Sequence, residues 1–125
     1  MKESLFRFDE IAGGYGDTII VSGITGAVAQ ASVLGIFGRN GVGKTTLSKL
    51  LVGALPLSSG SLQLHQQDLS SAGNHERRRH GVGYMPQTAM VFDNLSVREN
   101  LSLARSTQDM DYYMSAFPRL EERQN

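Results

Sequence analysis

The sequence of 125 residues contains no cysteine. This absence excludes a disulfide framework, a thiolate metal site and a thiol nucleophile. The 12 basic residues equal the 12 acidic residues, so no net field attracts nucleic acid or an anionic membrane surface. No apolar run reaches the length of a transmembrane helix, and the polar first residues lack the apolar middle of a signal peptide. We therefore expect a small cytosolic domain, or part of one, with no nucleic-acid partner.

One stretch fits the phosphate-loop pattern Gly-x-x-x-x-Gly-Lys-[Ser/Thr]. It consists of Gly38, Arg39, Asn40, Gly41, Val42, Gly43, Lys44, Thr45 and Thr46. An apolar run at 33–37 precedes the loop, and leucines at helical spacing follow it at 47–55. These flanks predict a turn between a buried strand and an amphipathic helix. They disfavour the alternative, a glycine-rich surface turn with a solvated lysine.

The residue types in this loop suit a polyphosphate. Glycines let backbone N–H groups approach the phosphate oxygens, and the start of the following helix adds a favourable dipole. The Lys44 ammonium can reach the β- and γ-phosphates, and the Thr45 hydroxyl can ligate a Mg²⁺ ion that bridges those oxygens. Thr46 can add a further phosphate contact. The sequence therefore predicts a binding site for a nucleotide triphosphate.

Alternating and β-type runs flank this unit on both sides and predict a mixed sheet, with two or three antiparallel strands before the loop. A glycine-rich turn is predicted at 13–17 and a break at 23–26. The predicted strands outside the loop's own flank are 5–8, 18–21, 27–29, 61–64 and 81–85. Tyr15 falls on the first of these turns, where an aromatic ring can stack on a flat base. It can equally be an ordinary turn tyrosine, and the residues alone leave both possibilities open.

Helices are predicted in the second half of the chain. Asn74 can cap a short helix whose basic run at 76–79 is interpreted as a solvated face rather than a polyanion site. Ser96 and Glu99 have the spacing of a capping box. A stripe of apolar residues at 110–117 predicts a last helix, which a proline at 118 should stop.

The loop, Tyr15 and the stretches 57–62, 83–87 and 95–101 together resemble the nucleotide-binding subunit of ABC transporters. The resemblance runs from about Leu5 to Arg123, and residues 38–47 and 116–123 look most like the ATPase subunits of branched-chain amino acid and urea importers. It implies an α/β P-loop NTPase fold of the ABC type. That fold has a mixed sheet with N-terminal antiparallel strands, a Walker A helix and the start of a helical subdomain.

The resemblance also implies roles for individual residues, with ATP and Mg²⁺ as cofactors. Tyr15 would be the A-loop aromatic that stacks on adenine, and residues 38–46 would be the Walker A loop. Lys44 and Gln87 would be catalytic, with Gln87 as the Q-loop glutamine that senses Mg²⁺ and the attacking water. Thr45 and Gln87 would contact the metal.

Residues 1–125 would then be the N-terminal part of one ATPase domain, with its core at 1–95 and the start of its helical subdomain at 96–125. The family's signature motif, Walker B strand, D-loop and switch histidine follow the matched region and are absent from this sequence. We therefore expect a truncated domain that binds ATP, turns it over negligibly alone and associates through exposed apolar edges. Two departures, at 30–32 and 65–66, replace turns usual in the family and affect loop conformation more than chemistry.

The implied partners are integral-membrane permease subunits and a second ATPase subunit, which would hold the protein on the inner face of the cell membrane. The apolar residues Met90, Val91 and Phe92 would lie near the permease or anchor their own loop. The implied function is ATP-driven solute import, of amino acids or urea. One alternative is a short non-catalytic nucleotide-binding or interaction module. A soluble ABC ATPase of translation or DNA repair is disfavoured because the sequence has no basic stripe.

Overall fold

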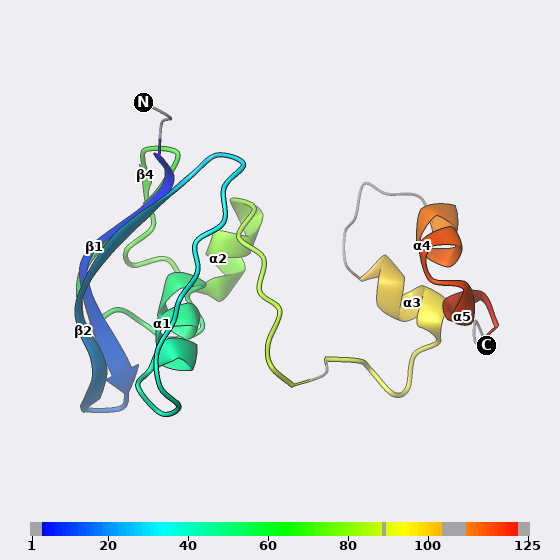
Figure 1. The fold of residues 1–125 in the computed structure, drawn as a ribbon, viewed down its shortest axis with the longest axis horizontal. Coiled ribbons are helices and arrows are strands. Elements are labelled where there is room, and N and C mark those ends of the chain that lie inside the picture. Colours follow the sequence, from blue (N-terminus) through cyan, green and yellow to red (C-terminus); the bar gives the residue numbers. More distant parts are fainter. Residues whose placement is uncertain (1–3, 89, 104–109, 123–125) are drawn as a thin grey trace. The chain divides into compact units, whose positions relative to one another are not determined.

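The computed structural model describes residues 4–88, 90–103 and 110–122, and it divides into two compact units, Met1–Tyr84 and Met85–Asn125 (Figure 1). The first unit contains β1 (Ser4–Tyr15), β2 (Thr18–Ala29), α1 (Lys44–Leu51), β3 (Ser59–Leu64), β4 (Gln67–Asp68) and α2 (Asn74–Arg79). The second contains α3 (Val97–Ser102), α4 (Met110–Ala116) and α5 (Pro118–Glu121). Residues 1–3 lie outside the described residues, so the polar start, from which the absence of a signal peptide is predicted, is described only from Ser4. Arg123, the last residue of the stretch that resembles importer ATPases, also lies outside them.

The four strands form one sheet in the order β2-β1-β3-β4, and every described pairing is antiparallel. The structure therefore contains the antiparallel part of the predicted mixed sheet. Of the predicted turn at 13–17, only Gly16 and Asp17 form a turn, which joins β1 to β2. The predicted break at 23–26 is wrong, because β2 continues through it, and β1 and β2 are strands of 12 residues each. Register shifts between β1 and β2, among them those at Ile11 and Gly13, absorb the glycines as bulges without ending the pairing.

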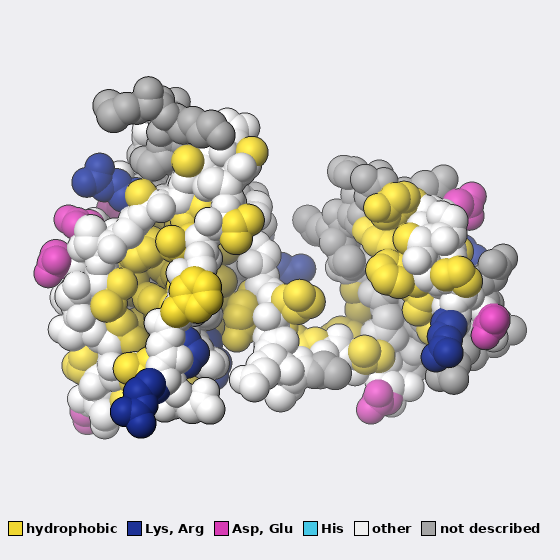
Figure 2. Space-filling model, viewed as in Figure 1, with side chains coloured by type: hydrophobic (Ala, Val, Ile, Leu, Met, Phe, Trp, Pro, Cys, Tyr) yellow, Lys and Arg dark blue, Asp and Glu magenta, His cyan; other side chains and the backbone are white. Residues whose placement is uncertain are grey.

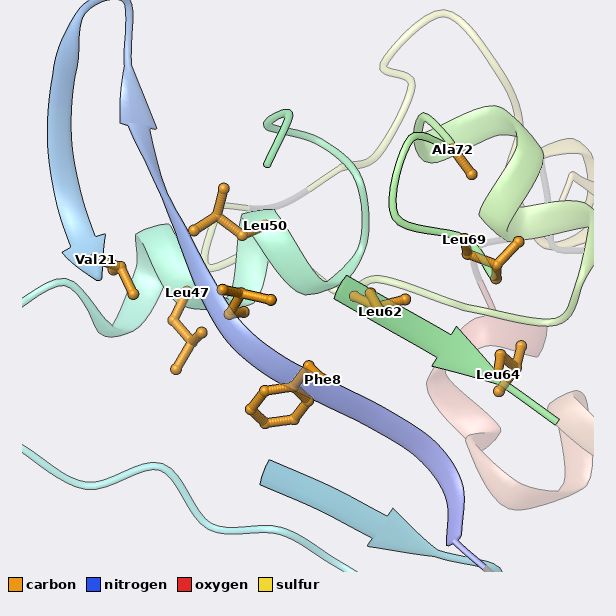
Figure 3. Packing of buried hydrophobic residues seen from close by; sticks show 9 residues of the cluster. Phe8, Val21, Leu47, Leu50, Leu62, Leu64, Leu69 and Ala72 are labelled. Carbon is orange, nitrogen blue, oxygen red and sulfur yellow. The ribbon is translucent and has the colours of Figure 1, made fainter. Parts of the chain in front are cut away.

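The core of the first unit lies between α1 and the sheet. Leu47 and Leu50 of α1 belong to one buried cluster with Phe8 of β1 and Leu62 of β3 (Figure 3). Leu62 and Leu64 are buried, while the residues that alternate with them along β3 are exposed, as expected for a sheet with one covered face. The helix that follows the phosphate loop is therefore fixed to the sheet through its leucines.

The predicted strands at 33–37 and 81–85 are wrong for this structure, which describes both stretches as chain without regular secondary structure. Val33 is 97% exposed and Phe37 is 94% exposed, so the first stretch buries almost nothing at its two ends. An extended segment becomes a strand only when a neighbour accepts and donates its backbone hydrogen bonds. Within the described residues, no strand pairs with either stretch.

We expect the chain to associate through residues 33–37, because this stretch is apolar, uncharged and exposed, and hydrophobic side chains gather on the face over which it runs (Figure 2). Replacing Val33 and Phe37 by aspartate should raise the monomer fraction in sedimentation velocity. The matched control adds the same two charges at the exposed polar positions Gln63 and Ser71 and should leave association unchanged. A monodisperse unmodified monomer that melts cooperatively would contradict the expectation.

In the second unit, the predicted capping box is confirmed. The Glu99 N–H donates to the Ser96 hydroxyl, and the Ser96 N–H donates to the Glu99 carboxylate. The Asn100 side chain then binds backbone groups of Phe92 and Leu95, which ties the preceding loop to α3. The proline at 118 does end α4, and it also begins α5 at the first helical position, where proline is well tolerated.

Candidate functional site

The phosphate loop has a conformation that depends on its glycines. Gly41 and Gly43 have φ values of 81° and 106°, in the left-handed region that side chains disfavour. Gly43 is also the N-cap of α1, and a β-carbon there would lie 3.1 Å from Cγ2 of Val21 on β2. The loop is thus seated against the sheet at its helical end. Gly38, Arg39, Asn40, Gly41 and Val42 are all exposed.

The Lys44 ammonium is folded back onto this loop. Its Nζ donates to the carbonyl oxygens of Gly38 and Arg39, both at 2.7 Å. The loop is further closed by a turn in which the Val42 N–H donates to the Arg39 carbonyl at 3.4 Å. The structure therefore brings both ends of the predicted loop together around one positive charge.

The start of α1 can receive an anion. The helix has no acidic residue in its first turn and no side-chain cap, and its first intrahelical bond runs from the Leu47 N–H to the Gly43 carbonyl. Earlier N–H groups of the turn have no partner within the helix, and they carry the positive end of its dipole. Thr45 is exposed there, whereas Thr46 is buried, so the phosphate contact of Thr46 stays a prediction.

Tyr15 lies at the end of β1 and is held on α1. Lys49 Nζ donates to the Tyr15 hydroxyl at 3.1 Å, and the residue is 47% exposed. The hydrogen bond from Lys49, with a smaller one from Thr46, lowers the pKa of Tyr15 below its usual value. The same bond to Tyr15 raises the pKa of Lys49. Tyr15, the aromatic residue predicted to stack on the base, therefore contacts the helix that begins at the phosphate loop.

Gln87 belongs to the second unit, where it is exposed and lies outside regular secondary structure. Its role beside the phosphates stays a prediction. Met90, Val91 and Phe92 are likewise exposed, and their contact with a permease also stays a prediction. Of the predicted site residues, the structure thus gathers Tyr15 and the loop on one unit.

Sequence reasoning missed two residues that hold the other end of α1. Arg77 is 1% exposed, and its Nη1 donates to the carbonyls of Leu50 at 2.6 Å and Leu51 at 2.8 Å. Asn74 is not the N-cap of α2, which is Gly73; its side-chain amide donates to the Val52 carbonyl at 3.1 Å. The interpretation of 76–79 as a fully solvated face is therefore wrong at Arg77. The three-residue spacing that puts Asn74 and Arg77 on one helix face was the available signal.

Comparison with known proteins identifies relatives of known family. A family model described as ABC transporter matches residues 21–125. The probable branched-chain amino acid transport ATP-binding protein LivF of Archaeoglobus fulgidus is 33% identical over 123 residues, which cover 93% of this chain and 52% of the relative. The lipopolysaccharide export system ATP-binding protein LptB of Escherichia coli K12 is 34% identical over 99 residues, which cover 79% of this chain and 41% of the relative. The chain spans about half the length, or less, of these curated relatives.

Solved structures agree in fold. A structure described as the ATP binding subunit of an ABC transporter superposes with a TM-score of 0.75 at 25% identity, covering 97% of this chain and 53% of that one. A nucleotide-free ATP-binding cassette from an ABC transporter gives a TM-score of 0.73 at 22% identity, covering 94% of this chain and 47% of that one. The predicted fold class is confirmed. No helix in the described part of the chain combines the length and apolarity needed to cross a membrane.

Proposed function

The chain belongs to the ABC transporter family, and on this premise we propose that it forms the ATP-binding part of a transporter ATPase subunit. The observation that carries the proposal is the phosphate loop at the start of α1, which has no side-chain cap. In this loop Gly41 and Gly43 have left-handed backbone conformations, and the Lys44 ammonium is folded onto it. Exposed amides, a positive helix end and a mobile cation are the features that a polyphosphate requires.

The residues present fit Mg-ATP by their chemistry. The loop and Lys44 would hold the phosphates, and the half-exposed ring of Tyr15 would receive the adenine. The Thr45 hydroxyl, which is exposed in the first turn of α1, would hold the metal. The family resemblance assigns a further metal contact to Gln87. Bound Mg²⁺ supplies neutralisation of the charge on the phosphate oxygens.

We propose that the complete subunit hydrolyses ATP and that this chain alone binds it with negligible turnover. Lys44 and Gln87 would act on the γ-phosphate and its attacking water, but neither the loop nor α1 carries a carboxylate that could position that water. Permease subunits and a second ATPase subunit would complete the working assembly and place it at the cytoplasmic face of the membrane. The exposed apolar residues at 90–92 would lie near the permease.

Within this proposal, import of amino acids or urea is favoured over other transport. The similarity to LivF extends over 93% of the chain, whereas that to LptB extends over 79%. The resemblance to importer ATPase subunits also rests partly on the stretch 116–123, in the C-terminal part of the chain.

Binding to the full chain should depend on the length of the phosphate tail. In calorimetry with Mg²⁺ present, we expect ATP to bind more tightly than ADP, and AMP to bind at least about 10-fold more weakly than ATP, because each lost phosphate removes charge-assisted bonds to the loop. Adenosine should give no measurable heat. Equal affinities for ATP and AMP, or no uptake of ATP by folded protein, would contradict the proposal.

A further inference from the structure

Lys49 holds Tyr15 by the hydroxyl end of its ring. The Lys49 ammonium lies 3.1 Å from the hydroxyl oxygen but 5.3 Å from the ring centroid. The ammonium therefore lies over the ring toward its hydroxyl edge. This contact restrains the direction of the ring, and 47% of the tyrosine surface stays exposed.

The strand end that carries Tyr15 is packed directly on α1. A β-carbon at Gly13 would collide with the Leu50 side chain, so β1 and α1 approach as closely as glycine allows. The backbone at this point is set by packing, and the remaining freedom belongs to the tyrosine side chain. Lys49 on α1 restrains that side chain through its hydroxyl.

Lys49 is poorly placed to bind phosphates itself. Lys44 begins α1, and Lys49 follows five residues later, which corresponds to about 7.5 Å along the helix axis. A polyphosphate on the loop would meet the positive start of the helix and not the turn that carries Lys49. The two lysines of this helix therefore have different tasks.

We propose that Lys49 is a positioning residue for the base half of the nucleotide site, which it serves by holding Tyr15 in the orientation that receives adenine. The inference rests on the proposed function and adds a residue to it. A ring fixed before the nucleotide arrives spares the complex the loss of side-chain freedom on binding, an effect of about 2- to 10-fold in affinity. The affected part of the affinity is the part that depends on the base.

The test compares Mg-ATP with Mg-tripolyphosphate, which has the phosphate tail but no base, by calorimetry on the full chain. Lys49→Met should weaken ATP binding about 2- to 10-fold and change tripolyphosphate binding by less than about twofold. Tyr15→Phe, which keeps the ring and loses the hydroxyl, should have the same effect. Both variants break the same hydrogen bond between Lys49 and Tyr15, so the double variant should bind ATP no more weakly than either single variant. Arg78→Met removes a positive charge from an exposed position of the same unit and should change neither affinity.

Equal weakening of ATP and tripolyphosphate by Lys49→Met would overturn the inference, since Lys49 would then act on the phosphates. So would unchanged ATP binding in both Lys49→Met and Tyr15→Phe. Failure of the proposed function is recognised separately, by a wild-type chain that takes up neither ligand. Independently of any ligand, ultraviolet titration should show the pKa of Tyr15 rising toward its usual value of about 10 in Lys49→Met, and no rise would also overturn the inference.

Discussion

Replacing Lys44 by alanine is expected to weaken Mg-ATP binding by about 100-fold or more while leaving the fold intact. The ammonium has three N–H donors, of which two bind the carbonyls of Gly38 and Arg39. When phosphates arrive, this charge can exchange neutral acceptors for anionic ones, and hydrogen bonds to charged groups contribute about 1.5–3 kcal/mol each. Two such bonds lost in Lys44→Ala correspond to at least two orders of magnitude in affinity.

Calorimetry on the full chain measures the loss, and the urea midpoint of each variant tests whether the fold survives. Lys44 lies at the surface, where its bonds to the loop contribute little to stability, so the midpoint should move only slightly. Arg78→Met is the matched control, because it removes one positive charge outside the loop and should bind ATP normally. Retention of ATP binding within about threefold in Lys44→Ala would refute the phosphate-loop assignment.

The features that could be predicted from the sequence are those that depend on neighbours along the chain. The phosphate loop at 38–46 and the start of α1 are encoded by glycines and a lysine at fixed spacing. The capping box needs only Ser96 and Glu99, because each side chain satisfies the other's backbone N–H. Hydrogen bonds of this kind join residues three apart at the start of a helix, so they need no partner from a distant part of the chain.

Features that depend on distant partners could not be predicted in the same way. The apolar run at 33–37 has the composition of a strand, but strand formation requires a neighbour, and no described strand provides one. The glycines of β1 and β2 read as turns because bulges are created by the register of two paired strands, which neither sequence contains alone. Tyr15 and Lys49 are 34 residues apart, so their contact follows from the packing of α1 on the paired strands β1 and β2.

Arg77 shows the same limit for charge. Three consecutive arginines at 77–79 have the same chemistry, and only the position of α2 relative to α1 decides which one is buried. The buried one lies at the C-terminal end of α1, where it donates to the last carbonyls of the helix, which carry the negative end of the helix dipole. The phosphate loop and Arg77 thus occupy opposite ends of one helix. We therefore expect the stability of the helix that follows the loop to depend on a residue remote from the loop.

Arg77→Met is expected to lower the free energy of unfolding by about 2–4 kcal/mol, a large part of the 5–15 kcal/mol typical of a domain. The substitution leaves the part-buried carbonyls of Leu51 and Ser70 without their Arg77 donor, and it removes one of the donors to the Leu50 carbonyl, which also accepts from the Gly53 N–H. Nε of Arg77 is buried and has no hydrogen-bond partner among the described residues, so its removal offsets part of the loss. The carbonyls outnumber that single nitrogen, which fixes the sign.

Urea denaturation followed by circular dichroism measures this change, with Arg78→Met as the matched control. Arg78 is exposed on the same helix, so its replacement should shift the free energy of unfolding by no more than about 0.5 kcal/mol. Arg77→Lys separates charge from shape: it keeps the cation but loses the planar fork that reaches two carbonyls, and it should fall between the wild type and Arg77→Met. Equal stabilities of the Arg77→Met and Arg78→Met variants would mean that the guanidinium does not hold the end of α1.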